Sequence, residues 1–490
     1  MLPFVTYQRS LLIPFFIFLA CGVMAISMNG LLWILVPFIW ILLPVVFTYT
    51  VTNTEKLFWL LLITIPLSTE LNITSSLGLD FPDEVLLMLL SFLSVIKMIY
   101  QPAWFPRSVS ANPLFFLVMV HMIWLLVTCL YSVEPLLSLK YVLAKTWYII
   151  PLVILPQVIL SSKDHISRSA LCLLIPMLAV VIQALVRHSF YGFSFASIGK
   201  IMFPFFRNHV NYSSMLVCLL PVARCVYRLT PEDKKSRKWL LAALIIGVAG
   251  LLFAYSRGAW IALLAGVCIN RIIMKRMLGS FVVLAIVAIL VSVSWLVTDK
   301  QFMRFAPDHD RTVFHTDFNE HMLATVEGKD VSSAERWYRW VAGVRMLADK
   351  PVTGFGPNSF YPHYRPYTVN SFKTWVSNNP EHSTVHNYFI LVALEQGVTG
   401  LLLFSLLYFG MLLATQRLYH QLQSRFYKSI ALTLGIVLTM IGVINCMSDM
   451  IETDKIGGLF WLSLGFIILL EHQLKEEKSV ICHQSTAISA

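Results

Sequence analysis

The series of long apolar runs constrains this chain more than any other feature. A helix needs about 20 apolar residues to cross a bilayer, and about fourteen runs approach that length. Only 13% of the residues are charged, whereas an ordinary soluble domain carries roughly 25%. We therefore expect an all-α polytopic membrane protein with about 12–14 transmembrane helices. The runs begin near Leu11, Leu31, Leu57, Val85, Leu114, Tyr148, Ala170, Tyr212, Leu240, Ala259, Phe281, Tyr388, Ile430 and Gly458, and the third and tenth are the shortest.

Positive charge lies mainly in alternate connections between these runs. If the N-terminus is cytoplasmic and the first run is an uncleaved signal anchor, the even-numbered connections hold most of the Lys and Arg, including the cluster from Arg224 to Lys238. The outer connection from Ser68 to Glu84 has acids but no Lys or Arg. This bias explains the net charge of +11 without a nucleic-acid partner.

One connection is far longer than the others and divides the chain. We expect a transmembrane bundle at 1–298 with about eleven spans, an outer loop at 299–385, C-terminal transmembrane helices at 386–472 and a cytoplasmic tail at 473–490. Within the loop, a capping box at 332–335 and tryptophans at helical spacing predict an amphipathic helix near 333–348. Long loops of this kind are usually functional.

Several basic residues lie at outer span ends, where positive-inside bias would remove them. Arg207 precedes the eighth span, Arg257 lies in a very short connection, and His386 begins the span after the loop; Lys140 and Lys145 precede the sixth span. Arginine near hydrocarbon is costly unless it is paired, although it can snorkel to lipid phosphates. Arginine forks bind phosphate, and a neutral imidazole can accept a proton from a hydroxyl. The pattern predicts one outer site where an alcohol attacks a substrate whose leaving group is a lipid-linked phosphate or pyrophosphate.

We expect neither a metal nor a cofactor. His309, His315 and His321 recur every six residues, which is not a zinc spacing, and the eight cysteines form no Cys-x-x-Cys pair. A phosphate-binding Gly-Lys-Ser/Thr loop is also absent from the sequence, so ATP-driven transport has no support.

The segment from Arg207 to Gly400 resembles bacterial O-antigen ligases of the ligase/polymerase (Wzy_C-type) superfamily. His386-Asn387 followed by Gly397 and Gly400 matches the histidine motif of that family. "SRGAWIALL" is similar to its arginine segment with Ile261 in place of leucine, "RNHVN" is similar to its Arg/Asn-rich entry, and "ERWYRWVAGVRMLADKPVTGFGPNSF" is similar to its loop helix and Gly-rich turn.

The resemblance implies an inverting, metal-independent GT-C glycosyltransferase of the bacterial inner membrane, with its active site facing the periplasm. The donor would be a glycan on undecaprenyl pyrophosphate, and the acceptor a hydroxyl of lipid A-core. Arg207 and Arg257 would bind the pyrophosphate, and His386 would be the base or would position the hydroxyl. Further substrate-binding candidates are Asn387, Asn208, His209, Asn211, Tyr255, Arg336 and Arg339.

Some alternatives stay open. An O-antigen polymerase or a protein O-oligosaccharyltransferase would use the same donor, and a transporter of a lipid or amphipathic anion is the hypothesis from another class. His386 could also be a plain interfacial histidine. His382 and Glu381 could tune it, and Asp449 and Glu452 could bind acceptor hydroxyls. Glu395 lies about 180° around the helix from His386 and should pair elsewhere; Gly397 and Gly400 suggest close approach of a neighbouring helix.

Overall fold

The computed structural model describes residues 52–74, 77–306, 331–374, 376–379 and 382–489. The chain divides into two compact units, Met1–Phe58 and Trp59–Ala490. The runs near Leu11 and Leu31 lie outside the described residues, as do His309, His315, His321 and Glu381.

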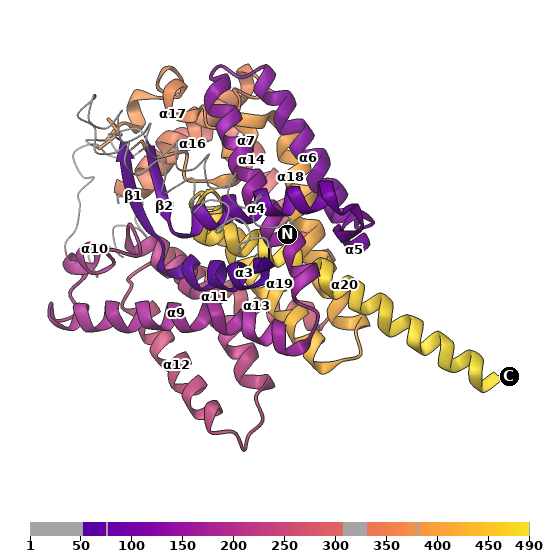
Figure 1. Ribbon diagram of the computed structural model, residues 1–490. Helices are drawn as coiled ribbons and strands as arrows, with labels where there is room; N and C mark the ends of the chain where they lie inside the picture. The colour runs from indigo at the N-terminus through magenta and orange to yellow at the C-terminus, as the bar shows by residue number, and fades with distance from the viewer. Residues whose placement is uncertain (1–51, 75–76, 307–330, 375, 380–381, 490) are drawn as a thin grey trace, which may run out of the picture. The chain divides into compact units, whose positions relative to one another are not determined.

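The second unit is built almost entirely of helices (Figure 1). The helices are α3 (Thr54–Thr64, which begins in the first unit), α4 (Asp83–Tyr100), α5 (Arg107–Ser110), α6 (Pro113–Leu130), α7 (Pro135–Ile149), α8 (Leu155–Ile159), α9 (Lys163–Ser189), α10 (Ile198–Ile201), α11 (His209–Leu229), α12 (Lys235–Leu252), α13 (Arg257–Met274), α14 (Leu278–Val297), α16 (Val331–Asp349), α17 (Phe360–His363), α18 (Tyr388–Gln421), α19 (Arg425–Asn445) and α20 (Asp454–Ser489). The expected all-α polytopic fold is confirmed.

Nine helical segments among the described residues are long and apolar enough to span a membrane. They are Pro113–Leu130, Pro135–Ile159, Lys163–Ser189, His209–Leu229, Arg257–Met274, Leu278–Phe305, Tyr388–Gln421, Arg425–Asn445 and Asp454–Val480. The chain is therefore a multi-pass membrane protein.

Other predicted spans differ from the structure. The run near Leu57 forms α3, whose 11 residues are too few to cross a bilayer. The runs near Val85 and Leu240 form α4 and α12, of 18 residues each, and both helices carry three charged residues and fall outside the nine. The sixth span begins at Pro135 rather than near Tyr148, so Lys140 and Lys145 lie inside helix α7 instead of before it.

The connection from Ser68 to Glu84 contains the two strands of the described chain. Strands β1 (Thr69–Thr74) and β2 (Leu77–Phe81) pair antiparallel as a hairpin, with Thr69 opposite Phe81. Long apolar runs did not predict these strands, because each strand has only five or six residues.

Asparagine and serine side chains fix where several spans begin. Asn112 accepts from the backbone N–H groups of Leu114 and Phe115 at the start of α6, and Ser162 accepts from His165 at the start of α9. These caps satisfy backbone donors that the first helical turn leaves without partners. Helix α13 packs along α19, α18 packs against α19 and α6, and the loop helix α16 packs on α18 (Figure 1).

Candidate active site

The start of helix α18 is hydrogen-bonded to the turn between α19 and α20. The Asn387 side chain caps α18 by accepting from Ile390 N–H at 3.1 Å, and its amide donates to the Cys446 carbonyl at 2.9 Å. The backbone N–H of Tyr388 donates to the Ser448 carbonyl at 3.1 Å. The first residues of α18 therefore keep a fixed position relative to residues 446–449.

His386 lies just before this cap in a constrained backbone conformation. Its φ is 54°, in the left-handed region that few non-glycine residues adopt. Its Nδ1 lies 3.9 Å from Oδ1 of Asp449, too far for a direct hydrogen bond, and 34% of its side-chain surface is exposed. Left-handed residues of this kind cluster at functional sites. His386 thus combines an unusual backbone with partial solvent access.

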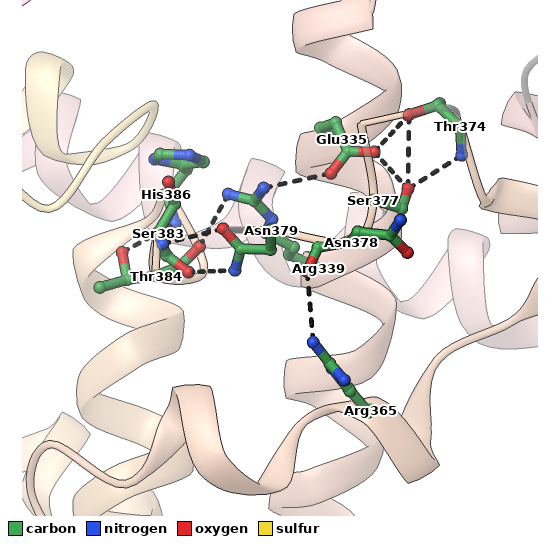
Figure 2. A network of polar contacts seen from close by, with 10 residues as sticks. All are labelled: Glu335, Arg339, Arg365, Thr374, Ser377, Asn378, Asn379, Ser383, Thr384 and His386. Carbon is green, nitrogen blue, oxygen red and sulfur yellow. Dashed lines mark hydrogen bonds and ion pairs between the residues drawn. The ribbon is translucent and has the colours of Figure 1, made fainter. Parts of the chain in front are cut away.

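Two arginines of α16 lie beside His386. Arg336 donates from Nε to the Met447 carbonyl at 3.1 Å and from Nη1 to Ser332 Oγ at 2.8 Å. Arg339 donates from Nη1 to the Thr384 carbonyl at 3.3 Å (Figure 2). The loop helix therefore places one cation on the 446–449 turn and the other on the segment that carries the histidine.

Glu335 holds the Arg339 guanidinium from the other side. Its Oε2 lies 3.1 Å from Nη2 of Arg339, and both side chains are buried. Its Oε1 accepts from the hydroxyls of Thr374 and Ser377 (Figure 2). The buried carboxylate thus has hydrogen-bond donors for both oxygens and a cation that offsets its charge. This network therefore holds the guanidinium of Arg339 in place.

The segment leading to His386 is also held by reciprocal bonds. The Asn379 side chain donates to the Ser383 carbonyl and accepts from the Ser383 N–H, both at 2.9 Å (Figure 2). His382 has φ 53° and stacks on Tyr361 with ring centroids 4.0 Å apart. His382 therefore packs within the loop rather than against the imidazole of His386.

The surroundings of His386 favour its neutral form. Burial in the first place, and then the charges of Arg339 and Arg336, together lower the pKa of His386 to about 3. Burial is also the main reason that the pKa of Asp449 is raised. The imidazole is therefore neutral near pH 7, and the site is ready for an anion.

Arg257 approaches the same turn from another helix. It is the first residue of α13, and the following residue, Gly258, packs so closely on Met447 that an added Cβ would lie 3.3 Å from the Met447 Cε. Two residues earlier, Tyr255 has φ 50° and donates its hydroxyl to the Phe193 carbonyl at 2.9 Å. The start of α13 therefore flanks the 446–449 turn, as the start of α18 does.

The residues around Arg207 form a separate group at the start of α11. Asn208 caps that helix by accepting from Asn211 N–H at 2.9 Å, and His209 is its first residue. Arg207 is exposed, and the described residues give its side chain no hydrogen bond or ion pair. The structure thus gathers His386, Asn387, Arg336, Arg339 and the start of α13, but no contact joins Arg207 to them.

Sequence reasoning assigned no role to Glu335 beyond a capping box, and that reading is wrong. Its carboxylate bonds Arg339, Thr374 and Ser377 instead of the start of its own helix. The sequence predicted only that Asp449 could bind acceptor hydroxyls, whereas its carboxylate lies beside His386. Apart from the pair with Arg339 on the same helix, these contacts leave no signal in the sequence, because they join residues about 40 or more positions apart.

The Gly-rich turn of the loop enters a break in helix α18. Gly397 has φ 71° and ψ −178°, and the Val398 N–H donates to the Pro351 carbonyl at 2.8 Å. A Cβ on Gly397 would lie 1.9 Å from the Val352 carbonyl oxygen. The backbone of the loop approaches Gly397 closely here. The prediction that a neighbouring helix approaches Gly397 is therefore wrong. At Gly400 a Cβ would meet the Gln396 side chain at 2.3 Å.

Glu395 binds the same turn. Its Oε1 accepts from the backbone N–H groups of Ser359 at 3.0 Å and Phe360 at 3.3 Å, whereas the N–H of Gly356 donates to its carbonyl at 2.9 Å. The prediction that Glu395 pairs away from His386 is confirmed.

The two lysines of α7 differ in environment. Lys145 is buried and pairs with Glu452 at 3.0 Å, so Glu452 serves this ion pair. Lys140 is exposed. In the described part of the chain, no three His, Cys, Asp or Glu side chains gather in a manner that could hold a metal ion.

Comparison with known proteins identifies one family. Residues 242–405 match the model of the O-antigen ligase family (Wzy_C), a segment that begins in α12, includes α13 and α16, and ends in α18. A search of curated proteins finds no match. The matched segment carries His386, Asn387, Arg257, Arg336 and Arg339. Across residues 242–405, this multi-pass membrane protein is therefore similar to the O-antigen ligase family.

Proposed function

We propose that the protein is an inverting O-antigen ligase of the GT-C type, which moves a glycan from undecaprenyl pyrophosphate to a hydroxyl of lipid A-core. The reaction would occur at the periplasmic face of the bacterial inner membrane. The observation that carries this proposal is the grouping of His386 with Arg336, Arg339 and the start of α13 around one turn. The matched family supports a lipid-linked glycan as donor.

The donor pyrophosphate would bind among the cations. Arg257, at the first position of α13, combines a guanidinium with the positive end of a helix, an arrangement that favours anions. Arg336 offers further positive charge beside His386. Arg339 is buried and bound to Glu335 and Thr384. Its role would be to add positive charge near His386 and to hold the segment around Thr384 in place. Arg207, exposed at the start of α11, would meet the donor only if the donor extends to that helix.

The proton step depends on the donor. An imidazole whose pKa is about 3 is a weak base, but a pyrophosphate bound beside the arginines would offset their charge and raise that pKa. With donor present, the acceptor hydroxyl attacks the anomeric carbon, the bond to the pyrophosphate oxygen breaks with its electron pair, and the hydroxyl proton passes to His386. Donor binding would therefore make His386 a stronger base before the acceptor reacts.

The test is the lipopolysaccharide ladder of a deletion strain. The strain would carry the native chain, His386→Ala, or His472→Ala, whose imidazole is exposed on α20 far along the chain from the site. We expect the native chain and His472→Ala to restore glycan on lipid A-core. His386→Ala should transfer at least about 100-fold more slowly, as for loss of a general base. Immunoblots of membranes would show equal amounts of each protein.

The ladder also separates the proposal from its relatives. Core without glycan, with accumulation of long carrier-linked glycan in the deletion strain, supports the ligase. Core carrying a single repeat would instead identify a polymerase. A full ladder from His386→Ala would remove the catalytic role of His386 in either case.

A further inference from the structure

A large cavity lies between helices α9, α11, α19 and α20. Its volume is about 1210 Å³, larger than the roughly 300–1,000 Å³ of ordinary small-molecule pockets. Its inner wall includes the buried side chains of Leu173, Leu219, Val437, Leu459 and Leu462. A space of this size with apolar walls suits a hydrocarbon chain rather than a compact polar solute.

The hydroxyl groups on the inner wall do not change that character. Ser169, Thr433 and Ser463 each donate to a carbonyl of their own helix, at 2.7, 2.8 and 2.7 Å respectively. Because their donors are already used, they offer a polar ligand few bonds. The interior therefore has little to attract a charged or strongly polar molecule.

The mouth of the cavity is cationic. It includes Arg228 at the end of α11 and Arg425 at the start of α19, both exposed, together with Lys234 and Arg237. Arg237 pairs with Glu232 at 2.9 Å, whereas the described residues give the side chains of Arg228 and Arg425 no ion pair. Two arginines therefore remain to bind an anion beside an apolar cavity.

This mouth is at the opposite end of the bundle from His386. Helix α19 begins at Arg425, at the cavity mouth, and ends at Asn445, just before the turn beside His386. Its 21 residues rise about 30 Å at 1.5 Å per residue, which is the thickness of the hydrocarbon core. A ligand in this mouth cannot be the group that reacts at His386.

We propose that this cavity binds an anionic phospholipid, with its headgroup phosphate on Arg228 and Arg425 and an acyl chain between α9, α11, α19 and α20. Charge complementarity at the mouth selects the headgroup, and the apolar walls hold the chain. The site is independent of the proposed transferase chemistry, because it uses none of the same residues. By charge bias its mouth faces the cytoplasmic leaflet.

Native mass spectrometry of the full chain in detergent would test this site with phosphatidylglycerol and phosphatidylcholine as probes. We expect one tightly held phosphatidylglycerol and at least about fivefold weaker retention of phosphatidylcholine. The double variant Arg228→Gln/Arg425→Gln should weaken phosphatidylglycerol binding at least about tenfold. Arg271→Gln is the matched control, since Arg271 is exposed near the C-terminal end of α13 and does not line the cavity.

A second variant separates the cavity from the surface charge. Val222→Trp keeps both arginines but fills part of the cavity, so it should also reduce phosphatidylglycerol binding. Size-exclusion profiles equal to that of the native chain would show that each variant is folded. Equal retention of the two lipids, an equal loss in Arg271→Gln, or unchanged binding in Val222→Trp would each overturn the proposal.

Discussion

At the residue scale, the low pKa of His386 makes stability depend on pH. In the unfolded chain the imidazole takes up a proton below its ordinary pKa near 6.5, but in the folded protein it does so only near pH 3. The unfolded state therefore binds more protons in this window, and stability falls as the pH drops from about 6.5 to about 3. His386→Gln removes this contribution. The melting temperature of the native chain should fall further between about pH 7 and about pH 5 than that of the variant.

Equal falls in the two proteins would mean that His386 titrates normally. The same imidazole can be followed by histidine NMR when a soluble pyrophosphate is added. A rise in its pKa on addition would support preparation of the base by the donor, whereas an unchanged pKa would contradict it.

The buried pair of Glu335 and Arg339 predicts a pattern among single and double variants. Arg339→Ala leaves the carboxylate of Glu335 buried without its cation, a change that costs about 3–5 kcal/mol in comparable pairs. Glu335→Gln in the same chain should recover part of that loss, because an amide needs no counter-charge and can still accept from Thr374 and Ser377. Chemical denaturation of Arg339→Ala, Glu335→Gln and the double variant measures the free energy of unfolding of each. A double variant as unstable as the sum of the singles would show that the pair is not coupled.

At the element scale, Gly397 determines how α18 meets the loop. Its φ of 71° and ψ of −178° belong to a region that only glycine populates readily, and a Cβ would collide with the Val352 carbonyl. Gly397→Ala should therefore destabilise the protein by at least about 1–3 kcal/mol. Gly279→Ala is the control, since a Cβ there meets nothing within 4 Å and alanine favours a helix. If both variants melt alike, the break in α18 needs no glycine.

The same elements show what sequence reasoning could and could not provide. Long apolar runs predicted the spanning helices, and the tryptophan spacing predicted a helix near 333–348, where α16 lies. Local patterns decide such features. The break at Gly397 and the contact of α16 with the 446–449 turn depend on residues far apart in the chain, and so do the bonds of Glu335 to Thr374 and Ser377. No spacing in the sequence encodes those distances.

At the scale of the whole molecule, the orientation of the bundle can be tested directly. Asn378 lies in the loop before His386, and Ser236 lies at the opposite end beside the cationic mouth; both are exposed. In a chain freed of its own cysteines, Asn378→Cys should react with an impermeant maleimide added to intact spheroplasts. Ser236→Cys should react only after the membrane is permeabilised. The reverse result would invert the proposed topology.

The turn that enters α18 also has a consequence for engineering. The backbone leaves the helix break at Pro351 and returns to it at Val398, and those two residues are joined by a 2.8 Å hydrogen bond. The stretch between them includes His386 and the first part of α18, which is bound to the 446–449 turn through Asn387 and Tyr388. A relative's segment should therefore graft here only if it keeps both junction residues and the bonds to that turn.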